Sequence, residues 1–163
     1  MDENNISIKT SVGKFSYRVG AIIMNSDSIL MAKNSRDSYY YTVGGRVKFG
    51  ETAQEAILRE IYEETKVILE IERLAFIHEN IFQFEKEPFH EIVMFFLMKQ
   101  NNEIEKLTCK TFDEEYGKVT LTWLAINGLE NIELYPEFLK TELNKPIKGI
   151  QHYISKYGKT TNE

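Results

Sequence analysis

Residues 43–67 read VGGRVKFGETAQEAILREIYEETKV, and this stretch decides the fold that we expect. A glycine-rich turn leads into an acidic helix. We expect the helix to begin at Thr52, because Thr52 followed three residues later by Glu55 forms a capping box. Apolar side chains then recur at helical spacing and predict the face that packs inward. They are Ala53, Ala56, Ile57 and Ile61.

Three glutamates of this helix share one side of it. At about 100° per residue, Glu60, Glu63 and Glu64 fall within roughly a third of the circumference. A glutamate-rich face is usually only solvated. Here Glu60 and Glu64 are like charges one turn apart, near the helix C-terminus, where the helix dipole disfavours negative charge. This placement favours a hard divalent cation as partner, and Gly44 and Gly45 let a bare carbonyl of the turn join the carboxylates.

Glu51 and Arg59 flank these glutamates in the sequence. Arg59 lies one turn before Glu63 and could pair with it, or it could reach back to Glu51 in the loop. We interpret Glu51 and Arg59 as a structural brace rather than as reacting groups.

The stretch resembles the Nudix box, G-x5-E-x7-R-E-U-x-E-E-x-G-U, in which U is a bulky aliphatic residue. The matching residues are Gly45, Glu51, Arg59, Glu60, Ile61, Glu63, Glu64 and Val67. The resemblance implies a Nudix hydrolase, an enzyme that uses a metal ion to cleave a diphosphate linkage, usually in a nucleoside diphosphate linked to another moiety. It also implies that Glu60, Glu63 and Glu64 are the main ligands of Mg²⁺, or of Mn²⁺, beside the Gly44 carbonyl.

The sequence departs from the family pattern at three positions. Lys66 replaces the last glycine of the box, which usually ends the helix in a left-handed conformation. That conformation costs a lysine about 1 kcal/mol, so we expect either a strained Lys66 or a differently ended helix. Val43 stands where many relatives have proline, and Lys48 where many have an acid. Lys48 could remove part of a metal site or favour a more anionic substrate.

The identity of the general base stays open, because family members differ in it. Some use the position of Glu60, and others use a glutamate outside the box. Glu91, Glu114 and Glu115 are the candidates here. Glu91 opens an apolar strand, where an inward acid would need a partner. A surface charge at the strand end is the alternative interpretation.

Four further residues are candidate substrate contacts. Arg18, Arg46 and Lys48 could each contact a phosphate, although surface solvation is the ordinary role of such side chains. Tyr41 belongs to a tyrosine run, residues 39–41, beside the glycine turn. Such a run is typical of a half-buried strand, and its position also suits base stacking.

Composition limits the class of protein. The 163 residues are 42% hydrophobic and 28% charged, which predicts one globular domain over residues 1–163. The net charge of −5 excludes a general affinity for nucleic-acid polymers or acidic membranes. A single cysteine, Cys109, excludes an internal disulfide. The first ten residues lack the apolar core of a signal peptide, and the longest apolar run, Ile92 to Met98, is too short to span a bilayer, so we expect a cytoplasmic protein.

Hydrophobic patterns predict strands, loops and two helices. We expect strands over residues 14–24, 29–32, 67–72, 74–84, 91–98 and 119–124, and polar loops over 34–37, 101–105 and 112–117. Pro136 suits the first turn of a short helix through Leu143. Residues 150–154 form a strand in our preferred interpretation and a helix in the alternative. The fold class is therefore α/β with a mixed sheet, a Nudix-like α/β/α sandwich whose catalytic loop-helix is Val43–Thr65.

Two functions agree with these observations. The first is a hydrolase that acts on a small-molecule diphosphate, which the resemblance implies to be a nucleotide. The alternative is a Nudix-fold module that binds or senses a nucleotide without turnover, although such modules usually lack some of the acids. Substrate choice is expected to depend on residues 34–42, 79–90 and 110–118. A homodimer, formed through an exposed strand or the late helix, is open.

Overall fold

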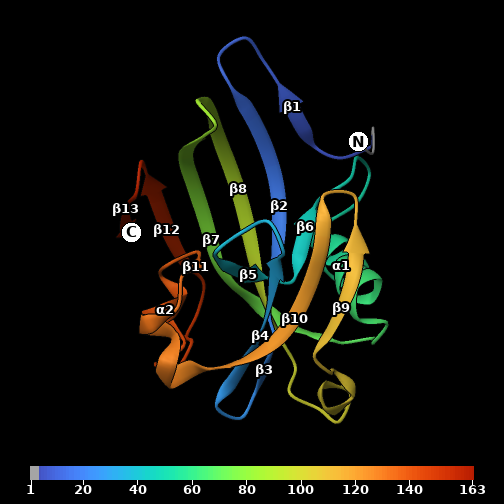
Figure 1. Ribbon diagram of the computed structural model, residues 1–163. Coiled ribbons are helices and arrows are strands. Elements are labelled where there is room, and N and C mark those ends of the chain that lie inside the picture. Colours follow the sequence, from blue (N-terminus) through green and yellow to red (C-terminus); the bar gives the residue numbers. More distant parts are fainter. Residues whose placement is uncertain (1–3) are drawn as a thin grey trace.

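The computed structural model describes residues 4–163 (Figure 1). Residues 1–3, the start of the segment in which we expect no signal peptide, lie outside the described residues. The strands are β1 (Ser7–Lys9), β2 (Lys14–Ile22), β3 (Met24–Asn25), β4 (Ser28–Asn34), β5 (Tyr40–Thr42), β6 (Gly44–Arg46), β7 (Ile71–Phe84), β8 (Glu87–Met98), β9 (Lys110–Glu114), β10 (Gly117–Ala125), β11 (Leu134–Tyr135), β12 (Gln151–Lys156) and β13 (Lys159–Asn162). The helices are α1 (Ala53–Thr65), α2 (Leu139–Glu142) and the 3-10 turns η1 (Ile104–Lys106) and η2 (Ile126–Asn131). None of the helices within residues 4–163 has the length and apolar character needed to cross a bilayer.

The strands form two sheets. One has seven strands in the order β1-β2-β8-β7-β12-β13, with β6 paired to β2. The other has six in the order β11-β5-β4-β10-β9, with β3 paired to β4. The pairs β2–β8, β7–β12 and β5–β11 are parallel and the remaining pairs are antiparallel. The predicted mixed α/β class is confirmed, with the strands divided between two sheets rather than gathered in one.

Helix α1 begins where the capping box predicts. The Thr52 hydroxyl accepts a hydrogen bond from the Glu55 amide at 3.2 Å, and the Thr52 amide donates to the Glu55 carboxylate at 2.8 Å. Its inward side chains, including the fully buried Ile57, pack against β2, β6 and β8. The helix ends at Lys66, which adopts the left-handed conformation at φ 62° and ψ 17°. This is the first of the two outcomes expected for the replaced glycine.

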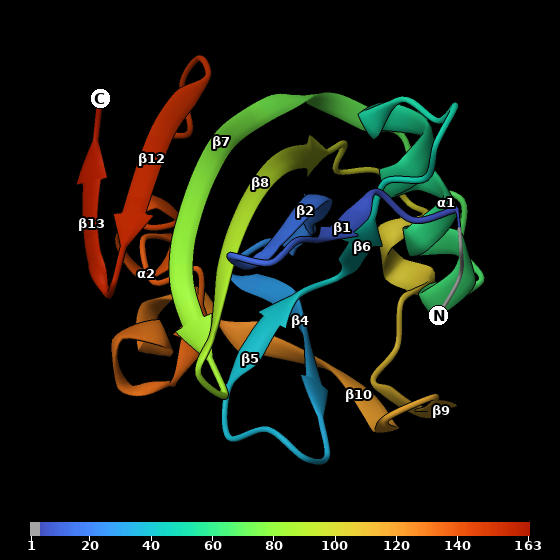
Figure 2. The same ribbon diagram turned by 90° about the horizontal axis from the view of Figure 1, so that it is seen from above.

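A second core lies on the other side of the molecule, and Figure 2 shows α1 and α2 at opposite sides of the sheets. Phe138 stacks on Tyr153 at 4.1 Å between ring centroids and meets Phe76 at 5.3 Å. Leu139 of α2 and Leu129 of η2 are fully buried in the same core. The helices therefore cover both sides of the strands, as the predicted sandwich requires.

Several predicted boundaries were wrong. The strand expected over 67–72 begins only at Ile71, and it continues unbroken to Phe84 because β8 pairs with it along that length. The loop expected over 112–117 is mostly a hairpin, in which β9 and β10 pair through Gly117 and Glu114. The late helix has only four residues, Leu139–Glu142, and the loop after β8 includes the turn η1 before β9 begins at Lys110. The strand interpretation of residues 150–154 is confirmed by β12.

Candidate active site

The glycine turn brings the start of the Nudix box against the helix. In the β2–β6 pair, Val19 lies opposite Gly45 and Gly20 opposite Gly44. A Cβ on Gly45 would lie 2.3 Å from a Glu60 carboxylate oxygen, and a Cβ on Gly44 would lie 2.2 Å from the Val19 carbonyl oxygen. Only glycine fits at these two positions, because the backbone of β6 passes directly over Glu60 and beside β2.

Two of the three box glutamates face this turn. The Gly44 amide donates to Glu64 Oε1 at 3.2 Å, and Glu60 lies against Gly45. Glu63 instead has a side chain that is 53% exposed, and it is connected to Glu60 only through Arg59, whose Nη1 lies 2.8 Å from Glu60 and 3.3 Å from Glu63. Within residues 4–163, no three His, Cys, Asp or Glu side chains are arranged as a ready metal site.

Burial raises the pKa values of the inward carboxyls. The pKa of Glu64 rises to about 8, mainly through burial and further through the charges of Glu60 and Glu114, against the hydrogen bond from Gly44. Burial also raises the pKa of Glu60, which the Arg59 hydrogen bond opposes, and that of Glu114, to which the charge of Glu60 adds. Two helix carboxylates and one from β9 therefore share a region with too little positive charge, and a divalent cation fits such a region.

Arg59 joins the turn, the loop and the helix. Its Nε and Nη2 donate to the two oxygens of Glu51 at 2.7 and 2.9 Å, and Nη2 also donates to the Arg46 carbonyl at 3.1 Å. Glu51 accepts a third hydrogen bond, from the Lys48 amide at 3.0 Å. The Arg59 hydrogen bond is the main reason that the pKa of Glu51 is lowered. A bidentate, partly buried pair of this kind fixes the turn relative to the helix.

The remaining predicted residues lie around this centre. Arg18 and Glu91 are 3.8 Å apart, and the Glu91 side chain is only 14% exposed, so the inward alternative for Glu91 agrees with the structure better than a surface charge. Tyr41 is half-buried, with a pKa raised by burial and by the charges of Glu114 and Glu64. Lys48 follows the turn and contributes its amide to Glu51.

The sequence analysis missed one aromatic residue near Tyr41, Tyr135, which contacts Tyr39 of the predicted tyrosine run. Tyr39 meets Tyr41 edge-on at 6.3 Å and Tyr135 at 5.1 Å between ring centroids. Tyr135 reaches this place through the two-residue parallel pair of β11 with β5. No local pattern in the sequence predicts the pairing of β11 with β5, because the two strands are far apart in the chain.

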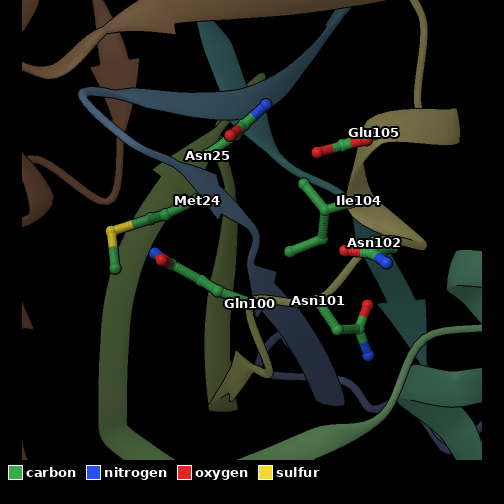
Figure 3. Close-up of a pocket in the computed structure, with 7 residues that line it drawn as sticks. All are labelled: Met24, Asn25, Gln100, Asn101, Asn102, Ile104 and Glu105. Atoms are coloured by element: carbon green, nitrogen blue, oxygen red, sulfur yellow. The ribbon is translucent and has the colours of Figure 1, made fainter.

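A separate hollow of about 190 Å³ lies elsewhere, between the β3–β4 turn and the segment after β8 (Figure 3). It is lined by Met24, Asn25, Gln100, Asn101, Asn102, Ile104 and Glu105. None of these residues belongs to the glycine turn or to α1. The hollow is therefore distinct from the carboxylate site.

Comparisons with known proteins agree with this arrangement. A family model described as NUDIX domain matches residues 14–141. An uncharacterized Nudix hydrolase, YvcI, of Bacillus subtilis (strain 168) is 22% identical over 115 residues, which are 71% of this chain and 69% of that protein.

Solved structures share the fold at low sequence identity. A mutator MutT protein from Bacillus halodurans superposes with a TM-score of 0.64 at 14% identity, covering 91% of this chain and 97% of that one. An ADP-ribose pyrophosphatase from Streptococcus suis gives a TM-score of 0.54 at 14% identity, covering 86% and 98%. The family match, which spans most of the chain, and the box on α1 together identify the protein: it belongs to the Nudix family, as an enzyme of the Nudix pyrophosphohydrolase type.

Proposed function

We propose that the enzyme hydrolyses a diphosphate linkage in a nucleotide or in a small molecule linked to a nucleoside diphosphate, and that it depends on Mg²⁺, or on Mn²⁺, for turnover. The observation that carries the proposal is the crowding of Glu60 and Glu64 against the Gly44–Gly45 turn, inside a NUDIX domain. Two half-buried carboxylates with raised pKa values and one arginine partner form a region that attracts a cation.

The ligands that we propose for the cation are Glu60, Glu63, Glu64 and the Gly44 carbonyl. Glu63 is exposed and bound to Arg59, so its side chain has to turn inward to join the other two. A divalent cation held there would offset the charge of the phosphate oxygens and make water more acidic. Glu64 has to lose its proton to bind the cation, because its pKa is about 8 without one.

Hydrolysis then needs a base and a fixed geometry. A water oxygen forms a bond to one phosphorus, the bond from that phosphorus to the bridging oxygen breaks, and a carboxylate takes the proton of the water. We propose Glu60, Glu91, and Glu114 or Glu115 as the candidates for this base. Glu60 and Glu114 influence each other electrostatically, whereas Glu91 is paired with Arg18. Arg59 orients Glu60 and is a positioning residue.

The substrate contacts come from the elements around the turn. We propose that Arg18, Arg46 and Lys48 contact phosphate oxygens and that Tyr41 contacts the remainder of the substrate. We further propose that residues 1–163 form a single domain that works in the cytoplasm, on a small molecule rather than a nucleic-acid polymer. Association into a homodimer stays a prediction.

The test is a turnover screen with nucleoside triphosphates, ADP-ribose, dinucleoside polyphosphates and nucleotide sugars, each with Mg²⁺, with Mn²⁺ and with a chelator. The neighbour from Streptococcus suis, named an ADP-ribose pyrophosphatase, is one reason to include ADP-ribose. We expect phosphate, pyrophosphate or a nucleoside monophosphate to be released only when metal is present. Saturable binding of a nucleotide, without any product in the presence of metal, would support the sensor alternative instead.

A further inference from the structure

Two arginines lie directly opposite each other beside the active site. In the antiparallel β2–β6 pair, Arg18 is the partner of Arg46. Directly opposite residues of such a pair place their side chains on the same face of the sheet, about 5 Å apart at Cβ, where like charges repel each other. This juxtaposition needs an explanation, since it disfavours the fold.

The protein itself compensates only part of this charge. Glu91 lies 3.8 Å from Arg18 Nη1, which is long for an ion pair but within its range. Arg46 Nε is inaccessible to water and has no hydrogen-bond partner among the described residues. A buried donor without an acceptor is unfavourable, and a charged one more so. Arg46 also lies within electrostatic range of Glu91 and Glu60, but its Nε donor lacks an acceptor among the described residues.

The arginine pair is close to the carboxylates but on another face. Successive residues of a strand point to opposite faces, so Arg46 leaves the face on which Gly45 meets Glu60. The position of Arg46 is fixed, because its carbonyl accepts a hydrogen bond from Arg59 at 3.1 Å. Lys14 lies four residues before Arg18 on the same side of β2 and extends the basic row. Both arginines nevertheless lie within electrostatic range of Glu60, so an anion bound by them would adjoin the group bound at Glu60 and Glu64.

We propose that Arg18 and Arg46 bind a further phosphate of the substrate, beyond the diphosphate that is cleaved. The substrate class is then a nucleotide or other small molecule with a polyphosphate or an additional phosphate group, in preference to diphosphates whose other substituents are uncharged. Arginine suits this role, because the terminal nitrogens of its planar fork donate to two phosphate oxygens at once. The identification of the anion as part of a substrate rests on the proposed function. The binding of an anion by Arg18 and Arg46 does not depend on it.

The test compares two inorganic ligands by titration calorimetry, tripolyphosphate and pyrophosphate, with Mg²⁺ present. The parent protein carries Glu64→Gln, so that neither ligand is hydrolysed during the titration. We expect Arg46→Gln to weaken tripolyphosphate binding by about tenfold to a hundredfold and pyrophosphate binding by much less. Lys99→Gln removes the same charge from an exposed pair with Glu70 and should change neither affinity.

Equal losses for the two ligands would overturn the proposal, because the arginines would then bind the diphosphate itself. Unchanged affinity for tripolyphosphate in Arg46→Gln would also overturn it. Both outcomes are distinct from a failure of the proposed function, which would appear as no turnover of any compound by the unmodified enzyme.

A second measurement separates binding from a structural role. Because Arg46 is partly buried beside a like charge and its Nε has no acceptor, Arg46→Met should melt at the same temperature as the parent or higher. It should also lose most of the rise in melting temperature that tripolyphosphate produces in the parent. A lower melting temperature without ligand, together with an intact rise on binding, would assign Arg46 to stability and contradict the proposal.

Discussion

Glu60 and Glu64 show how single residues create the site at the expense of stability. Both carboxyls are withdrawn from water, and burial raises both pKa values. Gly45 makes this possible, because the absence of a side chain lets the backbone lie directly on the Glu60 carboxylate. The geometry of the site therefore requires a residue without a side chain at position 45, as well as the two acids.

The requirement for glycine at position 45 can be tested by adding a Cβ there. In Gly45→Ala the new Cβ would lie 2.3 Å from Glu60 Oε1, so the carboxylate has to move. We expect kcat to fall by about tenfold or more, since small displacements of catalytic groups have effects of this size. Gly128→Ala is the matched control, because a Cβ there meets nothing within 4 Å. Unchanged kcat in Gly45→Ala would show that the position of Glu60 is not critical.

At the residue scale, the sequence predicted the acids of α1 but not their neighbours. Spacing along a helix is fixed, so the proximity of Glu60 and Glu64 follows from their numbers alone. The sequence offered an ion pair between Arg59 and Glu63 as one alternative, but it did not show that Glu63, unlike Glu60 and Glu64, has an exposed side chain. Glu114 was one of several candidates, and only the folded hairpin of β9 and β10 brings it near Glu60.

Helix α1 carries the carboxylates of the site. Its N-terminus is capped without strain, whereas its C-terminus has a lysine in the left-handed conformation. The capping box at Thr52 supplies hydrogen-bond acceptors for the backbone amides of Thr52 and Glu55. The other end requires a left-handed residue and has Lys66, whose Nζ donates to the Glu63 carbonyl at 2.9 Å. This hydrogen bond satisfies one of the last carbonyls and partly offsets the backbone strain.

Substitution of Lys66 measures that strain. Lys66→Gly should be more stable than Lys66→Ala by about 1 kcal/mol, because glycine adopts the left-handed conformation without the Cβ conflict and neither variant has the lysine hydrogen bond. Chemical denaturation of the two variants gives the difference. Both should keep the kcat of the unmodified enzyme, since Lys66 contributes no group to the carboxylate site. Equal stability of Lys66→Ala and Lys66→Gly would contradict the claim that the backbone is strained at position 66.

The hairpin β9–β10 shows where element prediction failed. Residues 112–117 are acidic and polar, and the sequence alone predicts a loop there. In the structure β9 is an exposed edge strand that pairs with β10 along five residues, with Thr111 and Thr120 hydroxyls 2.9 Å apart. An edge strand is often polar because both its edge and one face meet water, so its hydrophobic pattern is weak. The central strands are easier to predict from the sequence, because burial on both faces gives an unbroken apolar run.

At the scale of the whole molecule, the sequence predicted the class but not the division into two sheets. The parallel pairs β2–β8 and β7–β12 join segments far apart in the chain, and no local pattern encodes them. The second core, in which α2 covers β7 and β12, depends on the same pairings. Family resemblance supplied the arrangement that periodicity alone could not.

His78 connects this second core to the stability of the whole fold. It is 4% exposed, its Nε2 lies 2.7 Å from the Ser155 hydroxyl, and its ring meets Phe138 at 5.2 Å. Burial, with a smaller contribution from His152, lowers its pKa to about 4. The folded protein therefore keeps His78 neutral where the unfolded chain, with a pKa near 6.5, already binds a proton.

The sign of the pH effect follows from this difference. Between pH 6.5 and 4 the unfolded state binds more protons at His78, so the free energy of unfolding falls as the pH falls, by on the order of 2 to 3 kcal/mol in total. His78→Gln should remove this part of the pH dependence in denaturation curves. His90→Gln provides a control for the substitution itself, because it makes the same change at an exposed histidine outside the core. An unaltered slope in His78→Gln would contradict the assignment.

The most direct test of the carboxylate site is the Glu64→Gln variant, assayed with Mg²⁺ on the substrate that the screen identifies. We expect turnover to fall by about a thousandfold or more, while the melting temperature in metal-free buffer at neutral pH stays the same or rises, because a buried carboxyl with a raised pKa is replaced by a neutral side chain. Glu70→Gln, at an exposed glutamate paired with Lys99, should keep both properties. Full turnover in Glu64→Gln, or a loss of turnover that matches a loss of folded protein, would contradict the account.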